Sequence, residues 1–452
     1  MSRDSGARYR FGPRERGGTL AGWRPGQILT VAVGLGFGVL VLRAEPDAAG
    51  VGAAICILVL YGALAIVPLS GRTGDEWVPV TMCWVARRTR DGGRGRMGAL
   101  RSVRLLRADW HDMGVVHDRA ARTLTAALSL KGRSFALLGP DEQDRRVSGW
   151  ASVLGSLGRE GSAVHRVQWV AASFPDDGQA VRSYLAAEAV AAPSACTASY
   201  EGLLDDMDTH ACGHDVVLAL QVRLARSVEV GCATLAREVG SLVRLLADAD
   251  LQVDSILSTE DLAQQLVRTY EPGGGGSHGS PRQDPWPMAM EETWSSVRVD
   301  GMVHATFWVA EWPRIEVRSD FLAPLLLGSA RSTFAVVMEP LGSDAAVRKV
   351  EASRTADLAD SELRRRGGFV STARHARESE VLARRESELA EGHASFRYAG
   401  FVTISAANEE DLATACDTVQ HAAGQSRLAL RRLYGDQASA YTCTLPLCRG
   451  LR

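Results

Sequence analysis

Two uncharged apolar stretches lie near the start of the chain, and no comparable stretch follows them. The first, residues 25–42, has eighteen residues without a charge, and the second, residues 48–71, has twenty-four. A helix needs about 20 predominantly apolar residues to cross a bilayer, so the second stretch is long enough and the first is marginal. A five-residue connector, 43–47, separates the two stretches. The pattern therefore predicts a transmembrane helical hairpin over residues 25–71.

A cleaved signal peptide and a pair of buried core helices are the alternatives to this hairpin. A signal peptide has one apolar region, followed by a cleavage site of small residues. Here a second and longer apolar stretch follows the first after only five residues. The hairpin is the interpretation that this spacing favours.

Arginine residues flank the apolar pair unevenly. The connector carries one arginine and two acidic residues. The outer flanks carry Arg3, Arg8, Arg10, Arg14, Arg16 and Arg24 on one side, and Arg72 and the arginine-rich residues 87–107 on the other. Basic residues concentrate on the cytoplasmic side of membrane helices. We therefore expect a two-span protein of the cell membrane with both termini in the cytoplasm.

The rest of the chain alternates strand-like and helix-like patterns. Strands are predicted at 123–130, 164–174, 216–224, 303–311, 332–341, 397–405, 427–433 and 440–445, and helices at 139–159, 178–191, 200–208, 232–249, 345–391 and 409–423. The long charged stretch 345–391 is broken at Gly367-Gly368. The β-α-β-β-α-β order predicts an α+β fold with two cytoplasmic ferredoxin-like modules.

A glycine-, serine- and proline-rich segment separates the two predicted modules. The predicted organisation is a cytoplasmic N-terminal segment (1–24), the hairpin (25–71), a basic connector (72–110), a first α+β module (111–272), a linker (273–285) and a second α+β module with long charged helices (286–452). The basic connector is either a solvated tether or a segment attracted to anionic lipid headgroups. The sequence does not distinguish between these two interpretations of the connector.

The amino-acid composition excludes some classes of function. Lys and Arg number 51 against 53 for Asp and Glu, giving a net charge of −2, and 46% of the residues are hydrophobic. A bulk nucleic-acid binder would be strongly basic, and a disordered chain would lack this apolar material. Eight cysteines are too few for a disulfide scaffold in 452 residues. We expect no direct nucleic-acid binding.

Catalytic motifs are missing or misplaced. The only two lysines, Lys131 and Lys349, do not lie in a phosphate-binding G-x-x-x-x-G-K-[ST] sequence, which argues against a P-loop ATPase. A G-x-S-x-G match at 275–279 falls in the glycine-rich linker, whereas a nucleophile elbow needs a strained turn between a strand and a helix. We predict no catalytic residue and no enzymatic activity.

Metal and cofactor sites are not expected either. His210, Cys212 and His214 alternate so that a strand would place them on one face, but no fourth ligand cluster accompanies them. The acidic pairs Asp176-Asp177, Asp205-Asp206 and Glu291-Glu292 lie near predicted helix starts or in loops, where helix capping explains them. Trp150, Trp169, Trp286, Trp294, Trp308 and Trp312 are expected to be core or interface anchors.

Several short motifs together resemble a known family. They are GRSFALL (132–138), EQ (142–143), EWP (311–313), LAPLLL (322–327), RTADL (354–358), LALRRLYGDQ (428–437) and YTCTLP (441–446), along with the apolar hairpin. This set resembles actinobacterial integral-membrane proteins of type IV secretion (conjugation)-like gene clusters. The body is also similar to the non-motor N-terminal domain of conjugative-transfer ATPases. In those ATPases a P-loop motor follows the Leu-Pro, whereas this chain stops six residues after Pro446.

The resemblance implies a non-catalytic, membrane-anchored scaffold of a type IV secretion-like apparatus. Its implied partners are the lipid bilayer, a separately encoded P-loop secretion ATPase and polytopic channel subunits, in an oligomeric assembly. One alternative is the two-span E-component of type VII (ESX) secretion, which has a similar layout. A second alternative is a membrane-bound enzyme of unknown activity that uses a cleft between the modules.

Overall fold

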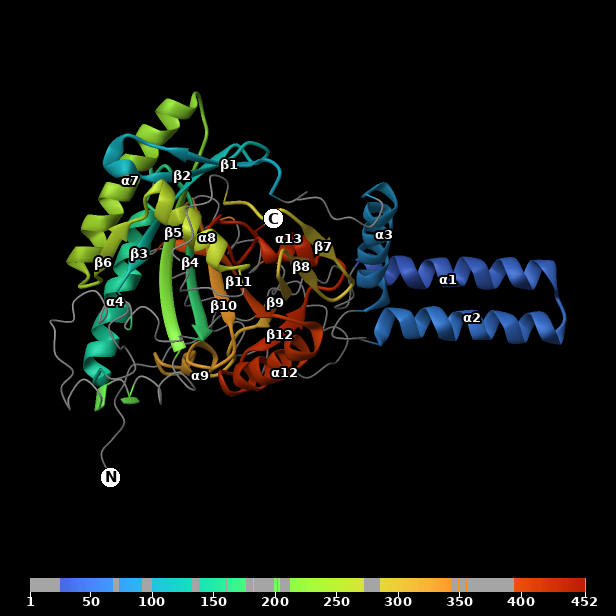
Figure 1. Ribbon diagram of the computed structural model, residues 1–452. Helices are drawn as coiled ribbons and strands as arrows, with labels where there is room; N and C mark the ends of the chain where they lie inside the picture. Colours follow the sequence, from blue (N-terminus) through green and yellow to red (C-terminus); the bar gives the residue numbers. More distant parts are fainter. Residues whose placement is uncertain are drawn as a thin grey trace.

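The computed structural model describes residues 25–67, 73–91, 100–131, 138–159, 161–175, 212–271, 285–342 and 394–451, with the short pieces 182, 199–200, 202–203, 348 and 355. Two helices, α1 (Pro25–Ala44) and α2 (Ala48–Ile66), form a hairpin that projects from an α+β body. A third helix, α3 (Gly74–Asp91), lies between the hairpin and the body (Figure 1). The predicted combination of an apolar hairpin and an α+β body is confirmed.

The hairpin packs tightly along its inner side and is apolar on its outer side. A Cβ atom at Gly34 would lie 2.6 Å from the Cβ of Tyr61, so only glycine allows this approach. The Gln27 amide donates to the Ala65 carbonyl oxygen at 2.8 Å across the open end of the hairpin. Leu29 and Val59 are each 65% exposed. Within the described ranges, α1 and α2 are the two helices long and apolar enough to cross a membrane.

A single antiparallel sheet of twelve strands forms the centre of the body. The first half of the chain contributes β1 (Val103–Arg107), β2 (Gly114–Asp118), β3 (Thr123–Leu130), β4 (Val164–Pro175), β5 (Cys212–Arg223) and β6 (Val253–Ile256). The second half contributes β7 (Met290–Glu292), β8 (Val297–Val299), β9 (Met302–Glu311), β10 (Ser332–Leu341), β11 (Ser395–Ala406) and β12 (Ala429–Arg432).

The two halves of the sheet repeat the same strand arrangement. The main path runs β1-β2-β3-β5-β4-β10-β11-β9-β8-β7, with β6 beside β3 and β12 beside β9. Each half therefore contains four strands in a matching order, β6-β3-β5-β4 and β12-β9-β11-β10. The equivalent strands β4 and β10 pair antiparallel in the middle, from Ser332 opposite Ser173 to Met338 opposite Val167. The two halves thus repeat one strand order, and the sheet runs without a break from one to the other.

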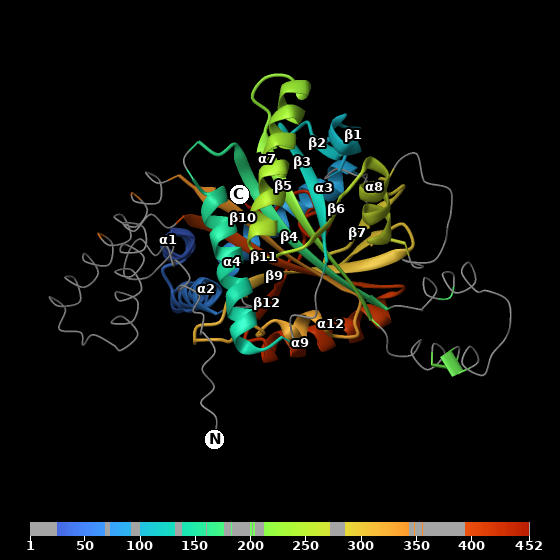
Figure 2. The same ribbon diagram turned by 90° about the vertical axis from the view of Figure 1, so that its left-hand side faces the viewer.

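Four helices cover one face of the sheet: α4 (Pro140–Leu157) and α7 (Val228–Asp248) in the first half, and α9 (Ala323–Leu326) and α12 (Glu409–Gln425) in the second. Figure 2 shows α4 and α7 lying across the strands. Side chains alternate between faces along each strand. On β5, Leu218 and Leu220 accordingly pack with α7, whereas Val217 and Ala219 belong to the core on the opposite face.

The opposite face is covered by α8 (Thr259–Arg268), α13 (Gln437–Tyr441) and the buried segment 442–448. This segment is hydrogen-bonded to both halves. The fully buried amide of Gln168 donates to the Cys443 carbonyl oxygen at 2.8 Å and accepts from the Cys448 N–H at 2.6 Å. In the second half, the hydroxyls of Thr403 and Thr444 lie 2.8 Å apart. The segment therefore joins the halves across the sheet.

Most strand and helix predictions are confirmed in the described residues. The predicted strands 123–130 and 332–341 coincide with β3 and β10. The predicted strand 440–445 is wrong: α13 ends there, and local turns follow, such as the Cys443 N–H bonded to the Ala440 carbonyl oxygen. The 72–110 region, expected to be a plain connector, contains α3, β1 and part of a short 3-10 helix, Trp110–Asp112.

Several predicted segments lie outside the described residues. They are the N-terminal segment 1–24, residues 132–137, the helices 178–191 and 345–391 apart from three single residues, most of the helix 200–208, and the linker up to residue 284. The predicted domain boundaries stay a prediction.

Candidate functional site at the junction of hairpin and body

Helix α3 starts directly at the open end of the hairpin, where glycine permits two close approaches. A Cβ atom at Gly74 would lie 2.8 Å from the carbonyl oxygen of Leu64 in α2. A Cβ atom at Gly26, in the first turn of α1, would lie 2.6 Å from Oδ2 of Asp75. Both distances are shorter than real Cβ contacts allow. The start of α3 is therefore packed against both helices of the hairpin.

A cluster of four aromatic side chains joins α3 to the body. Trp77 and Trp84 come from α3, Trp294 from the turn between β7 and β8, and Tyr434 from the turn after β12. The ring centroid of Trp294 lies 5.7 Å from that of Trp77, 5.3 Å from that of Trp84 and 6.2 Å from that of Tyr434. Each such pair contributes about 0.5–1.5 kcal/mol beyond the area it buries. We call these four residues the junction cluster.

The backbone beside the junction cluster has a conformation that favours glycine. Gly435 has a φ of +69°, in the left-handed region that other residues rarely adopt. A Cβ atom at this position would lie 2.7 Å from Cζ3 of Trp294. The Gly435 N–H also donates to the Trp294 carbonyl oxygen at 2.8 Å. The turn after β12 therefore approaches Trp294 only because residue 435 has no side chain.

Charged groups surround the junction cluster. Arg87 of α3 lies 2.8 Å from a carboxylate oxygen of Asp436 and donates to the Gly435 carbonyl oxygen. Burial opposes the charged form of Arg87, but the bond to Asp436 outweighs it and holds the pKa of Arg87 above its ordinary value. Near the start of α3, Glu76 lies 3.7 Å from Arg431 of β12. These ion pairs fix both the position of α3 and its rotation about its axis.

Burial raises the pKa of Glu292, a neighbour of the junction on β7. Its carboxylate accepts from the Ala438 N–H in α13 at 3.1 Å, and Arg87 and that hydrogen bond partly offset the rise in its pKa. Glu292 therefore ties β7 to the start of α13 just behind the junction cluster. Of the acidic pairs singled out in the sequence, Glu291-Glu292 lies on this strand, and the other two pairs lie outside the described residues.

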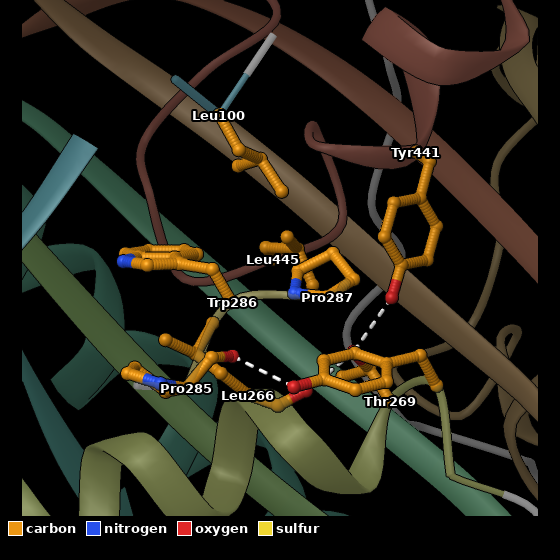
Figure 3. A pocket seen from close by; sticks show the side chains of 9 residues that line it. Leu100, Leu266, Thr269, Pro285, Trp286, Pro287, Tyr441 and Leu445 are labelled. Atoms are coloured by element: carbon orange, nitrogen blue, oxygen red, sulfur yellow. Dashed lines mark hydrogen bonds between the residues drawn. The ribbon is translucent and has the colours of Figure 1, made fainter. Parts of the chain in front are cut away.

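A small apolar pocket with about 10 Å³ of free space lies beside Trp286, between α8 and α13 (Figure 3). Its polar groups already have partners: the Tyr441 hydroxyl lies 2.7 Å from that of Thr269, and the Tyr270 hydroxyl donates to the Pro285 carbonyl oxygen at 2.8 Å. A single water molecule needs roughly 10–15 Å³ by the same measure. This pocket is therefore a packing gap rather than a place for a cofactor.

A second hollow, with about 30 Å³ of free space, lies where the two halves meet, at one end of β4 and β10. Arg331 caps the C-terminus of α8 by donating to the carbonyl oxygens of Arg268 and Glu271. Arg268 in turn lies 3.4 Å from the carboxylate of Asp215. Burial lowers the pKa of Arg331. The charged groups of this hollow thus hold the halves together.

Two serine–histidine pairs, which sequence reasoning missed, lie on paired strands. His304 Nδ1 lies 2.8 Å from the Ser405 hydroxyl, and His214 Nδ1 lies 3.1 Å from the Ser173 hydroxyl. His304 is fully buried, which lowers its pKa to about 3, and its ring packs 4.6 Å from that of Tyr441. Ser173 donates to the Leu326 carbonyl oxygen. Both serines are at most 8% exposed, and both line the hollow where the two halves meet.

The structure describes only part of the other predicted candidates. Cys212 and His214 lie on β5, with Cys212 opposite Pro175, while His210 and the G-x-S-x-G match lie outside the described residues. In the part of the chain that the structure describes, no group of three His, Cys, Asp or Glu side chains could hold a metal ion. Lys131 pairs with Asp254 at 2.9 Å beside β6.

Comparison with known proteins does not assign the chain to a family. No protein-family model matches the chain, and no curated protein matches it significantly in sequence. The functional argument therefore rests on the residues and their geometry, of which the junction between hairpin and body is the most developed feature.

Proposed function

We propose that this protein is a non-catalytic, membrane-anchored scaffold of a secretion apparatus of the type IV (conjugation-like) kind. In this role it docks a separately encoded P-loop ATPase to polytopic channel subunits in an oligomeric assembly. The observation that carries the scaffold role is the junction: α3 is packed against the hairpin and tied to the body by the junction cluster and by Arg87–Asp436. A body held this way keeps a fixed orientation at the membrane. The choice of apparatus rests on the resemblance of the sequence motifs.

The architecture supports a scaffold through its duplicated plan. The matching strand orders β6-β3-β5-β4 and β12-β9-β11-β10 support an interpretation as two ferredoxin-like modules. We propose that the body consists of two such modules fused edge to edge through β4 and β10, with segment 442–448 joining them on the face opposite the four helices. A fused platform of this kind offers two related surfaces to partner proteins.

The proposed topology places both termini in the cytoplasm and the connector between α1 and α2 outside. A cysteine introduced as Glu45→Cys should react with a membrane-impermeant maleimide in intact cells. The native Cys83 of α3 is exposed in the structure and serves as the internal control, because it should react only after the membrane is opened. Reaction at Cys83 in intact cells, located by peptide mapping, would place α3 outside and contradict this topology.

Purification from native membranes in a gentle detergent tests the scaffold role. A tagged full-length chain, crosslinked before extraction, should recover a P-loop ATPase together with polytopic channel subunits, as identified by mass spectrometry. An unrelated tagged two-span protein, expressed at the same level, is the control. Recovery of the chain alone would count against the proposal. Recovery of the core subunits of an ESX system would replace it with the type VII alternative.

A further inference from the structure

Helix α3 has an exposed apolar stripe on the side that faces away from the body. The stripe consists of Val78, Met82 and Val85, which are 55%, 67% and 51% exposed. Residues spaced four and three apart lie above one another on a helix, so these side chains form one continuous strip. Exposed side chains of this size in a row mark an interaction surface more often than isolated ones do.

The apolar stripe lies almost opposite the residues that hold α3 to the body. At 3.6 residues per turn, the stripe is displaced by roughly 140° around the helix axis from the face that carries Trp77, Trp84 and Arg87. That face contacts Trp294, Tyr434 and Asp436. The junction therefore fixes the rotation of α3 and turns the apolar stripe away from the protein.

The position of α3 indicates what the stripe meets. Figure 1 shows α3 lying crosswise to α1 and α2, between them and the body. Gly74 touches Leu64 near the end of α2, and Gly26, at the start of α1, touches Asp75. A bilayer crossed by α1 and α2 has its surface at this end of the hairpin. A helix lying crosswise there runs along that surface, with the side opposite the body turned toward the lipid.

The charges on α3 agree with this placement. Its acidic residues near the start are engaged by protein groups, since Asp75 bonds to the Thr73 hydroxyl and Glu76 lies near Arg431. Its other end carries Arg88, which is exposed and has its guanidinium carbon 5.0 Å from the centre of the Trp84 ring. Interfacial helices combine a buried apolar strip with basic residues that attract anionic headgroups.

We propose that α3 is an interfacial helix whose Val78–Met82–Val85 stripe lies in the headgroup–acyl boundary of the leaflet nearest the body. The lipid surface, rich in anionic headgroups, is its partner. This inference depends on the membrane anchoring in the proposed function but not on the secretion role. As a consequence, α3 contacts the membrane on one side and the junction cluster on the other. These two contacts hold the body at a fixed distance from the membrane and in a fixed orientation.

Spin labels on the full-length protein in nanodiscs of phosphatidylcholine and phosphatidylglycerol test the inference. The background replaces Cys56, Cys83, Cys196, Cys212 and Cys232, and keeps the buried thiols of Cys416, Cys443 and Cys448. Labels at Val78→Cys, Met82→Cys and Val85→Cys report whether the stripe is in contact with lipid or with water. The matched control is a label on Cys83 restored in this background, which is exposed on the same helix but outside the stripe. A label at Val59→Cys in α2 reports the membrane span itself.

The stripe labels should collide several-fold more often with oxygen, relative to a water-soluble nickel complex, than the label at Cys83 does. Equal access of the nickel complex to all four α3 labels would overturn the inference, because the stripe would then face water. Protection of the stripe from both reagents would also overturn it, because a protein would then cover the stripe. If the label at residue 59 is instead accessible to the nickel complex, α2 does not cross the membrane, and the membrane anchoring in the proposed function is wrong.

Discussion

The guanidinium of Arg87 lies 2.8 Å from the carboxylate of Asp436, a residue 349 positions further along the chain. This pair joins the first helix after the hairpin to the turn that leads into α13. The same turn contains Tyr434 of the junction cluster, and α13 leads directly into the segment that crosses both halves of the sheet. The apolar hairpin is therefore tied to the part of the body that holds the two halves together.

Replacing Arg87 should weaken the junction modestly. The Arg87 and Asp436 side chains are 44% and 35% exposed, and exposed ion pairs contribute about 0–1 kcal/mol. Arg87→Ala should therefore lower the free energy of unfolding by about 1 kcal/mol, and added salt should reduce the difference from the wild type. Thermal unfolding in detergent at two salt concentrations measures this. Arg88→Ala is the control, since Arg88 stacks on Trp84, and its effect should depend less on salt.

Two glycine substitutions should change stability in opposite directions. Gly435→Ala forces a side chain into the left-handed region and against Trp294, so it should destabilise the protein by about 1–3 kcal/mol. Gly424→Ala is the control, because Gly424 lies within α12 and a Cβ atom there meets nothing within 4 Å. Alanine is the better helix former by roughly 0.5–1 kcal/mol, so this change should stabilise. Chemical denaturation of both variants measures whether the free energy of unfolding falls or rises. No change in the free energy of unfolding of Gly435→Ala would contradict the described turn.

The long strands were predicted because each buries one or both faces, whereas the short strands β1, β2, β6, β7 and β8 were not predicted. The runs 123–130 and 332–341 show strand patterns that do not depend on which strand lies alongside, and they match β3 and β10. The pairing of β4 with β10 was not predictable from such patterns, since it joins strands from different halves. The run 440–445 is apolar because it covers the sheet, and coil segments that do so can read as strands.

Helix α3 was missed for a different reason. Its apolar residues lie on two faces, with Trp77 and Trp84 toward the body and Val78, Met82 and Val85 on the other side. A search for a single apolar stripe does not find such a helix, and Pro79 in its interior obscures it further. The junction itself could not be predicted, because its partners Trp294, Tyr434 and Asp436 come from distant turns whose positions only the fold determines.

Stability in acid should depend on Asp118. Its carboxylate accepts from Ser102 at 2.9 Å and from the Ala120 and Ala121 N–H groups at 3.1 Å, and it pairs with Arg449. Burial opposes ionisation, but Arg449 and these donors outweigh it and lower the pKa of Asp118. A lowered folded-state pKa stabilises the protein above the unfolded value of about 4, and the stabilisation is lost as the pH falls through the folded value.

Asp118→Asn should therefore flatten the dependence of stability on pH between neutrality and the acid range. The measurement is the urea midpoint at a series of pH values from neutral down past pH 4. The control is Asp254→Asn, whose carboxylate forms the exposed pair with Lys131. An unchanged pH profile in Asp118→Asn would mean that the Arg449 pair does not form.

The attachment of segment 442–448 to the sheet should depend strongly on one amide. Gln168 is fully buried on β4, and its side chain bonds to the backbone of Cys443 and Cys448. Gln168→Met keeps the volume but leaves a buried carbonyl and a buried N–H without partners, each costing about 1–3 kcal/mol. Chemical denaturation should show a loss of about 2–5 kcal/mol, and limited proteolysis should cut the segment faster. Gln420→Met on the exposed side of α12 should change stability by less than about 0.5 kcal/mol. Equal effects of the two substitutions would mean that the segment is held by its apolar side chains alone.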